Sequence, residues 1–207
     1  MHLVLPSSPF DGVWKRESIA LDGGAPFEDS NVYWLHAGDY FADMRWPKGD
    51  ESIGGLSAFA GTTHWDPPKM RFDHELDLHE TTAQDVGTLV FADNKLIESG
   101  EAVLPDKSVR FEEVWVRVSE PLASDCVARY VADESAGFIV RVGVFLAILE
   151  KKNDVLSAAT WRREKDWVPL FSIHRTLELE YTLKQFVSGS LGSPWVVRRN
   201  LTSDQIG

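Results

Sequence analysis

Residues 69–79 read KMRFDHELDLH, a strict alternation of two kinds of side chain. A period of two is typical of a β-strand with one buried face, whereas a helix would repeat about every 3.6 residues. The face expected to be buried carries Met70, Phe72, His74, Leu76 and Leu78. The other face carries Arg71, Asp73, Glu75, Asp77 and His79. This stretch therefore predicts β-structure, and it sets the interpretation of its neighbours.

Similar alternating runs recur along the chain, separated by short turn sequences that supply positive or preset φ angles. These turns are Gly38-Asp39, Asp66-Pro67-Pro68, Asp93-Asn94, Pro105-Asp106-Lys107, Asp133–Gly137 and Asn153-Asp154. Their spacing predicts antiparallel hairpins, about ten to twelve strands running from Val13–Leu21 to Trp195–Arg198. Residues 177–184 also alternate, although their Leu, Glu and Lys content leaves a helix open.

A meander of this length is expected to curl into a closed barrel, because closure removes the exposed strand edges. No linker-like segment divides the chain, so we expect an all-β, antiparallel up-and-down barrel formed by one domain over residues 1–207. The chain holds 8 Trp, 4 Tyr and 11 Phe, a heavy aromatic load that requires much interior surface to line. The aromatic count therefore agrees with a barrel that has an extensive interior.

The composition also excludes classes of partner. A net charge of −11 is a poor match to nucleic-acid phosphates or to an anionic membrane surface. The single cysteine, Cys126, cannot form an internal disulfide, and residues 1–6 lack the basic flank of a signal peptide. We expect a cytoplasmic protein that binds neither nucleic acid nor membrane, and a homodimer is left open.

A specific resemblance begins at Gly12-Val13-Trp14, which follows Pro9-Phe10-Asp11 at the start of the first expected strand. Together with residues 40–45 (YFADMR), 96–100 (LIESG) and 112–115 (EEVW), this motif resembles the lipocalins and the wider calycin group. Together these stretches look similar to a group of lipocalin-like proteins of microbes and fungi, most of them without assigned function. The similarity spans residues 1–120, and the second lipocalin signature, Thr-Asp-x-x-Tyr, is not found.

The resemblance implies a calycin-type barrel with an interior cavity. In that group the tryptophan of the Gly-x-Trp motif packs at the closed end of the barrel, beneath an arginine from a late strand. Here Arg163 and Arg198 are the two candidates for that arginine. The resemblance names no ligand.

Turn chemistry predicts which residues face each other near the middle of the chain. A two-residue turn at Asp93-Asn94 sets Phe91 opposite Leu96, Leu89 opposite Glu98 and Gly87 opposite Gly100. This face is the more apolar one and is expected to point inward.

The next hairpin has two possible registers. A four-residue loop over residues 104–107 sets Gly100 opposite Phe111, Glu98 opposite Glu113 and Leu96 opposite Trp115. A three-residue loop would turn Phe111 and Trp115 outward, because a slip of one residue flips every side chain. We favour the first register, since it buries both aromatic residues.

That register brings two glutamates together on an apolar wall. Glu98 and Glu113 could not both ionise cheaply there, so one is expected to keep its proton, with Arg117 and Arg141 as candidate counter-charges. A protonated and an ionised carboxyl can act as general acid and base, or can hold a polar group of a ligand. The alternative is that both glutamates face solvent or form structural ion pairs.

His74 interrupts an apolar face, where a hydrogen-bonded core histidine is the more common reading and a neutral imidazole in the cavity is the functional one. His79 lies five residues on, which places it on the opposite face of a regular strand. Neither these histidines nor Cys126 has the spacing of a metal site, and no metal is expected.

The hairpin around Gly38-Asp39 presents a choice of faces. By apolarity the inward face is Tyr33, Leu35, Ala37, Tyr40, Ala42, Met44 and Trp46. Asp43 and Arg45 would then form a solvated ion pair that contributes little stability. If the lumen is polar, the assignment reverses, and Trp34, Asp43 and Arg45 become cavity residues.

Two functions follow from these expectations. The first is a barrel that binds a small, mainly apolar molecule, with the ligand-binding residues Phe72, His74, Phe91, Glu98, Phe111, Glu113, Trp115, Arg117 and Arg141. The second is a cyclase, isomerase or lyase on the same barrel, with Glu98, Glu113 and His74 as its catalytic residues. Neither function calls for a cofactor. A filled barrel that serves as an interaction module is the third interpretation.

Overall fold

The computed structural model describes residues 3–4, 8–49, 55–79, 84–104, 107–174 and 177–199. Eight antiparallel strands close into a barrel. They are β2 (Gly12–Leu21), β3 (Ser30–Ala37), β4 (Tyr40–Pro47), β5 (Ser57–Asp66), β6 (Lys69–Asp77), β7 (Asp85–Ala92), β8 (Lys95–Leu104) and β9 (Lys107–Ser119). Neighbours in sequence pair with each other, and β2 pairs with β9 to close the ring. The predicted all-β, up-and-down barrel is confirmed.

The barrel has eight strands, so the expectation that ten to twelve strands form one barrel is wrong. The other strands form a separate sheet in the order β1-β15-β10-β11-β12-β13-β14. Their bounds are β1 (Leu3–Val4), β10 (Cys126–Ala132), β11 (Ser135–Val142), β12 (Phe145–Lys152), β13 (Val155–Arg163), β14 (Trp167–Ile173) and β15 (Val196–Arg199). The spacing of the hairpins is similar in the barrel and in the second sheet. It therefore predicts consecutive antiparallel strands but does not show after which strand the barrel closes.

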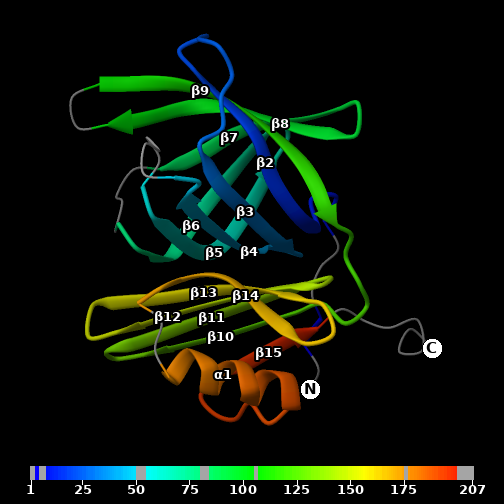
Figure 1. Ribbon diagram of the computed structural model, residues 1–207, viewed down its shortest axis with the longest axis vertical. Helices are drawn as coiled ribbons and strands as arrows, with labels where there is room; N and C mark the ends of the chain where they lie inside the picture. The colour runs from blue at the N-terminus through cyan, green and yellow to red at the C-terminus, as the bar shows by residue number, and fades with distance from the viewer. Residues whose placement is uncertain are drawn as a thin grey trace.

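The elements stack in three layers, with the barrel above the second sheet and the helix α1 (Leu177–Ser188) beneath it (Figure 1). Both faces of the sheet are therefore buried. Its barrel-facing side chains join the outer faces of β3 to β6 in a common core that includes Leu35, Met44, Phe138, Val140 and Leu149. The opposite face packs against α1. The nearly continuous apolar run at residues 138–149 is explained by this burial on both faces.

The alternating run at residues 177–184 forms the helix α1. Leu179, Leu183 and Phe186 recur at helical spacing, and they pack against the lower face of the sheet. The helix propensity of the Leu, Glu and Lys residues therefore predicts this segment correctly, whereas its alternating pattern predicts a strand.

Most turns lie where the sequence predicts them. Asp93-Asn94 and Asn153-Asp154 adopt positive φ at both residues, as tight two-residue hairpins require. Gly38 also has a positive φ, at the turn between β3 and β4. The predicted turn residues Pro105 and Asp106 lie outside the described residues.

The calycin-like closure of one barrel end is present, with a different arginine. Trp14 is 1% exposed and donates a hydrogen bond from Nε1 to the Phe10 carbonyl at 2.8 Å. The guanidinium of Arg117, from the last barrel strand, lies 4.5 Å from the Trp14 ring centroid. The expectation of Arg163 or Arg198 is wrong, because both belong to the second sheet.

Candidate functional site: the barrel lumen

The barrel encloses a cavity of about 350 Å³. Phe10, Trp14, Trp34 and Phe91 pack ring against ring and fill the end of the barrel covered by Arg117. At the rim of the cavity Leu21 and Val103 are exposed, the latter at 70%. The apolar part of the wall is largely aromatic, formed by Trp34, Phe41, Phe59, Phe72, Phe111 and Trp115, and more than half of the lining residues are charged or polar. The lumen is thus a pocket with an apolar floor and a volume within the range of small-molecule sites.

The register predicted for β7, β8 and β9 is present throughout. Leu89 pairs with Glu98, and Glu98 pairs with Glu113. Glu98 and Glu113 are 6% and 4% exposed, and both line the cavity. The structure therefore brings together the two carboxyls that the sequence placed on one inward face.

Glycines make room for this arrangement. A methyl group at Gly87 would lie 2.3 Å from the Glu98 carboxylate oxygen, and one at Gly100 would lie 2.7 Å from the Phe111 ring. Both contacts are shorter than real Cβ atoms show. Gly87 and Gly100 face each other in the ladder, so one cross-strand glycine pair accommodates the side chains of Glu98 and Phe111.

The two glutamates differ in their partners. Glu113 forms an ion pair with Arg16, whose Nε also donates to Glu28 at 2.8 Å. Glu98 accepts one hydrogen bond, at 3.1 Å, from the indole Nε1 of Trp115. Burial raises the pKa of Glu98 well above its usual range, and the negative charge of Glu113 raises it further. This environment therefore favours the protonated form of Glu98, which lies beside a Glu113 that is paired with Arg16.

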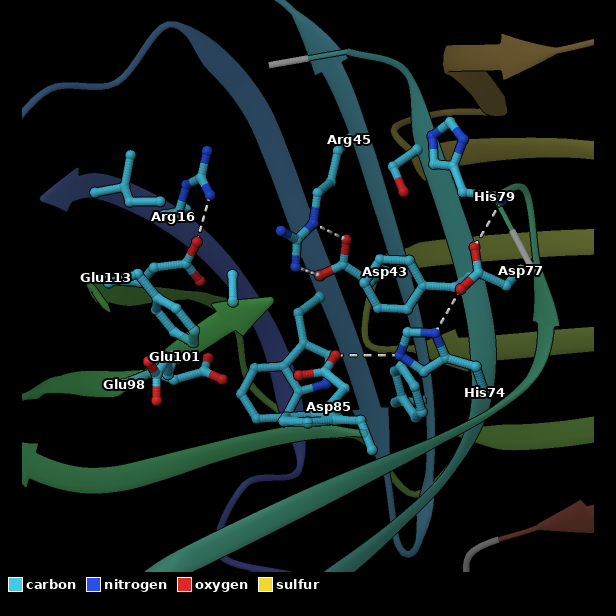
Figure 2. A pocket seen from close by; sticks show the side chains of 18 of the residues that line it. Arg16, Asp43, Arg45, His74, Asp77, His79, Asp85, Glu98, Glu101 and Glu113 are labelled. Atoms are coloured by element: carbon cyan, nitrogen blue, oxygen red, sulfur yellow. Dashed lines mark hydrogen bonds and ion pairs between the residues drawn. The ribbon is translucent and has the colours of Figure 1, made fainter. Parts of the chain in front are cut away.

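Asp43 and Arg45 lie inside the barrel, so the assignment of the β3–β4 faces by apolarity is wrong and the polar-lumen alternative is confirmed. Two hydrogen bonds, 2.7 and 3.2 Å long, join them (Figure 2). Tyr33, Leu35 and Met44 instead point out of the barrel, into the core shared with the second sheet. Both faces of this hairpin are buried, and therefore hydrophobicity could not distinguish inside from outside.

His74 is held between two carboxylates. Its Nδ1 lies 2.7 Å from Asp77 and its Nε2 lies 3.1 Å from Asp85, and its ring stacks on Phe59 with 4.3 Å between centroids. Burial alone would lower the pKa of His74, but the hydrogen bonds to Asp77 and Asp85 raise it to about 9. His74 is thus hydrogen-bonded, as the more common interpretation has it, and the ring is a paired cation at neutral pH instead of the neutral imidazole of the functional alternative.

A β-bulge places Asp77 beside His74. Gly61 pairs with His74 and Ala60 pairs with Leu76, which leaves Glu75 as an extra residue on β6. Beyond the bulge the two faces exchange, so Leu76 enters the core outside the barrel while Asp77 lines the cavity. His79 also lines the cavity, contrary to its expected place on the opposite face from His74.

Six of the nine predicted ligand-binding residues line the lumen: Phe72, His74, Glu98, Phe111, Glu113 and Trp115. The other three do not. Phe91 is 49% exposed and stacks on Phe10, 5.5 Å away between centroids. Arg117 covers Trp14, and Arg141 lies on the second sheet, 5.8 Å from the Trp167 ring centroid.

The counter-charges in the lumen are Arg16 and Arg45 instead of Arg117 and Arg141. Arg16 follows Trp14 by two residues on the same face of β2, and this alternation is the signal that could have identified it. Asp85, which lies opposite Phe72 in the β6–β7 ladder, had no such signal in the sequence.

A family model described as Protein HRI1 matches residues 12–193, which include the barrel strands β2 to β9 and the strands β10 to β14 of the second sheet. The chain belongs to the HRI1 family. Among solved structures, the HRI1-family chain is similar to the crystal structure of the uncharacterized protein YLR301w from Saccharomyces cerevisiae. The TM-score is 0.60 at 19% identity, over 80% of this chain and 89% of that one, which establishes likeness of fold. No curated protein matches significantly.

No helix in the described ranges is long and apolar enough to cross a bilayer.

Proposed function

We propose that the barrel lumen binds a small molecule with a mainly apolar body, held against the aromatic part of the wall and oriented by the polar groups beside it. The observation that carries this proposal is a cavity of about 350 Å³ that is closed at one end and open at the other. A filled barrel, the interaction-module alternative, would leave no such volume.

The nature of the wall supports the same proposal. Small-molecule sites combine aromatic surface with a small number of fixed polar groups, and here the polar groups are fixed by one another. Arg45 is held by Asp43, Arg16 by Glu113, and His74 by Asp77 and Asp85. The resemblance of the Trp14 and Arg117 closure to calycin barrels, which carry an interior cavity, agrees with it.

Intrinsic tryptophan fluorescence tests the proposal, since Trp34 and Trp115 are part of the cavity wall. A library of apolar metabolites should contain compounds that quench or shift this emission and raise the melting temperature. An Ala102→Trp variant fills the mouth of the cavity and should abolish the response. Ala132→Trp, at an exposed strand end of the second sheet, is the matched control and should bind normally.

Failure of the whole library to change either signal would count against a binding function. So would equal responses from the Ala102→Trp variant and the unaltered protein, because the compounds would then bind elsewhere.

A second function, a cofactor-free cyclase, isomerase or lyase, is favoured by one observation: Glu98 lies directly opposite Glu113, which is paired with Arg16. Burial raises the pKa of Glu98 and so favours its protonated form. Such a pair can donate a proton to a substrate and accept another. Both ring nitrogens of His74 are engaged by carboxylates, which leaves the glutamates as the acid and base. Glu98→Gln and Glu113→Gln should each abolish turnover of a substrate, and full turnover by both variants would eliminate this assignment.

A further inference from the structure

The ionic groups of the lumen do not balance. Three cations, Arg16, Arg45 and His74, are bound by five carboxylates, so the paired groups alone leave two excess negative charges. Glu98 and Glu101 are further carboxyl groups in the same wall. Figure 2 shows Glu98, Glu101 and Glu113 gathered on one side of the pocket, away from His74 and Asp77. That side offers hydrogen-bond acceptors to an occupant.

The two arginines of the lumen, Arg16 and Arg45, already donate hydrogen bonds to carboxylates of the protein. Arg45 donates to both oxygens of Asp43, and Arg16 is shared between Glu28 and Glu113. A carboxylate ligand would therefore have to compete with buried intramolecular pairs while meeting the negative charge of the wall. An anion is the poorest match to this pocket.

A second observation points to an absent ligand. Trp34 lines the cavity and is 2% exposed, yet within the described part of the chain its indole Nε1 has no hydrogen-bond partner. Buried N–H donors are nearly always satisfied, because an unpaired one costs about 1–3 kcal/mol. An oxygen atom on the body of a ligand would satisfy this donor.

We propose that the ligand carries one ammonium or amidinium group, which binds between Glu98 and Glu113, and an oxygen acceptor for Trp34 Nε1. This inference rests on the proposed binding function and specifies its ligand class. The aromatic rings of Phe111 and Trp115 lie in the same wall and present electron-rich faces to a cation.

Binding then exchanges one cation for one proton. The ligand enters with its positive charge, the carboxyl of Glu98 releases its proton to solvent, and the resulting carboxylate pairs with the ligand. No bond other than that O–H bond is broken. Proton release on binding is therefore the distinguishing signature of the proposal.

The test uses three molecular bodies, 2-phenylethyl, 2-(4-hydroxyphenyl)ethyl and hexyl, each carrying an ammonium, a hydroxyl or a carboxylate at the same position. Titration calorimetry in phosphate and in Tris, near pH 7, reports the number of protons released. Within a body, the ammonium compound should bind about tenfold or more tightly than the alcohol, and the carboxylate most weakly. The ammonium compounds should release about one proton.

Glu98→Gln keeps the shape of the protonated carboxyl and removes its acidity. It should abolish proton release and weaken the ammonium compounds about tenfold to a hundredfold, leaving the alcohols nearly unchanged. Glu112→Gln, on the exposed face of β9, is the matched control and should change neither quantity. Trp34→Phe should remove the preference for the 4-hydroxyphenyl body over the phenyl body. Should the Glu98 variant fail to fold, the binding enthalpies of the unaltered protein in phosphate and in Tris still show whether ammonium compounds release a proton.

Alcohols that bind as tightly as ammonium compounds, or ammonium binding without proton release, would overturn the inference and leave the binding function standing. The same holds if the metabolite library yields a neutral or anionic ligand while the nine compounds fail. If neither the nine compounds nor the library binds, the inference and the proposed function fall together.

Discussion

The interior of the barrel and the faces of the second sheet are both buried, but they are built from different side chains. The sheet is filled on both faces by residues such as Val140, Ala147, Ile148 and Leu149, each 0% exposed. The barrel instead buries Arg16, Asp43, Glu98 and Glu113 around an open volume. Burying charged groups is costly unless they are paired, and a cavity forgoes packing energy. The difference indicates that the sheet stabilises the fold, and it supports the binding function that we propose for the lumen.

The largest expected effect lies in the core between the two regions. Phe138 is 2% exposed on β11 and lies against Tyr40 of the barrel. Phe138→Ala should lower the free energy of unfolding by about 3–5 kcal/mol, because it leaves a cavity in a filled core. Phe111→Ala, in the cavity wall, should cost only about 1 kcal/mol, since one side of that ring already faces open space. Urea denaturation of both variants measures the contrast, and equal losses would show that the lumen is packed like the sheet.

Two glycines of the barrel ladders, Gly61 and Gly87, differ in what they face. A Cβ at Gly61 would lie 1.9 Å from the Asp73 carbonyl oxygen at the bulge, a backbone atom that cannot move aside. Gly61→Ala should therefore destabilise the protein by about 3 kcal/mol. At Gly87 the same methyl group meets the flexible end of Glu98, so Gly87→Ala should cost about 1 kcal/mol and should weaken ligand binding through a displaced carboxyl. Denaturation and calorimetry on the pair test this; equal destabilisation would contradict the special role of the bulge.

The ion pairs of His74 predict a pH-dependent stability. The folded-state pKa of about 9 lies above the ordinary value of 6.5, so the stabilisation is complete below pH 6.5 and is lost as the pH rises through 9. His74→Gln should cost on the order of 2 kcal/mol near pH 6 and much less near pH 10. Thermal denaturation across this range measures it, with His64→Gln on the exposed part of β5 as control. A loss that is the same at every pH would mean that His74 acts by packing alone.

Glu98 makes stability depend on pH in the same direction as His74, but substituting it should have a smaller and opposite effect on stability. Its folded-state pKa lies above the usual glutamate value, so the folded protein holds the proton longer and stability falls as the pH rises between the two values. Glu98→Gln removes the ionisation and should stabilise the protein by about 1 kcal/mol near pH 8, with no gain below about pH 4. Destabilisation near pH 8 would show instead that an ionised Glu98 is favourable in the empty barrel.

The part of the site on β7, β8 and β9 could be predicted from the sequence because its register depends on local chemistry. Asp93 and Asn94 tolerate the positive φ angles of a two-residue turn, and this turn fixes every pair along the hairpin as far as Gly87 and Gly100. The same face continues across β9, where burial of Phe111 and Trp115 selects the register that joins Glu98 to Glu113. Local turns and alternation were sufficient here.

The part on β3, β4 and β6 could not be predicted, because it depends on distant segments. Asp43 and Arg45 face the lumen since the second sheet covers the apolar outer face of the hairpin. His74 meets Asp77 only because a bulge opposite Gly61 shifts the alternation by one residue. The alternation of side chains along β3 and β4 does not show that a second sheet covers their outer face. The alternation along β6 likewise does not show where its bulge lies.

By itself, the sequence determined that this chain is an antiparallel β-protein, that its strands form a closed barrel, and that Glu98 and Glu113 share one face. These features follow from period, turn chemistry and short motifs, all of which act between neighbours in the chain. Only the tertiary structure decided that the barrel closes after eight strands, that the other strands cover its wall, and that Arg16, Asp43 and Arg45 point inward. The physical reason is that inward and outward are defined by what packs on each face, and that contact is made by residues far away in the sequence.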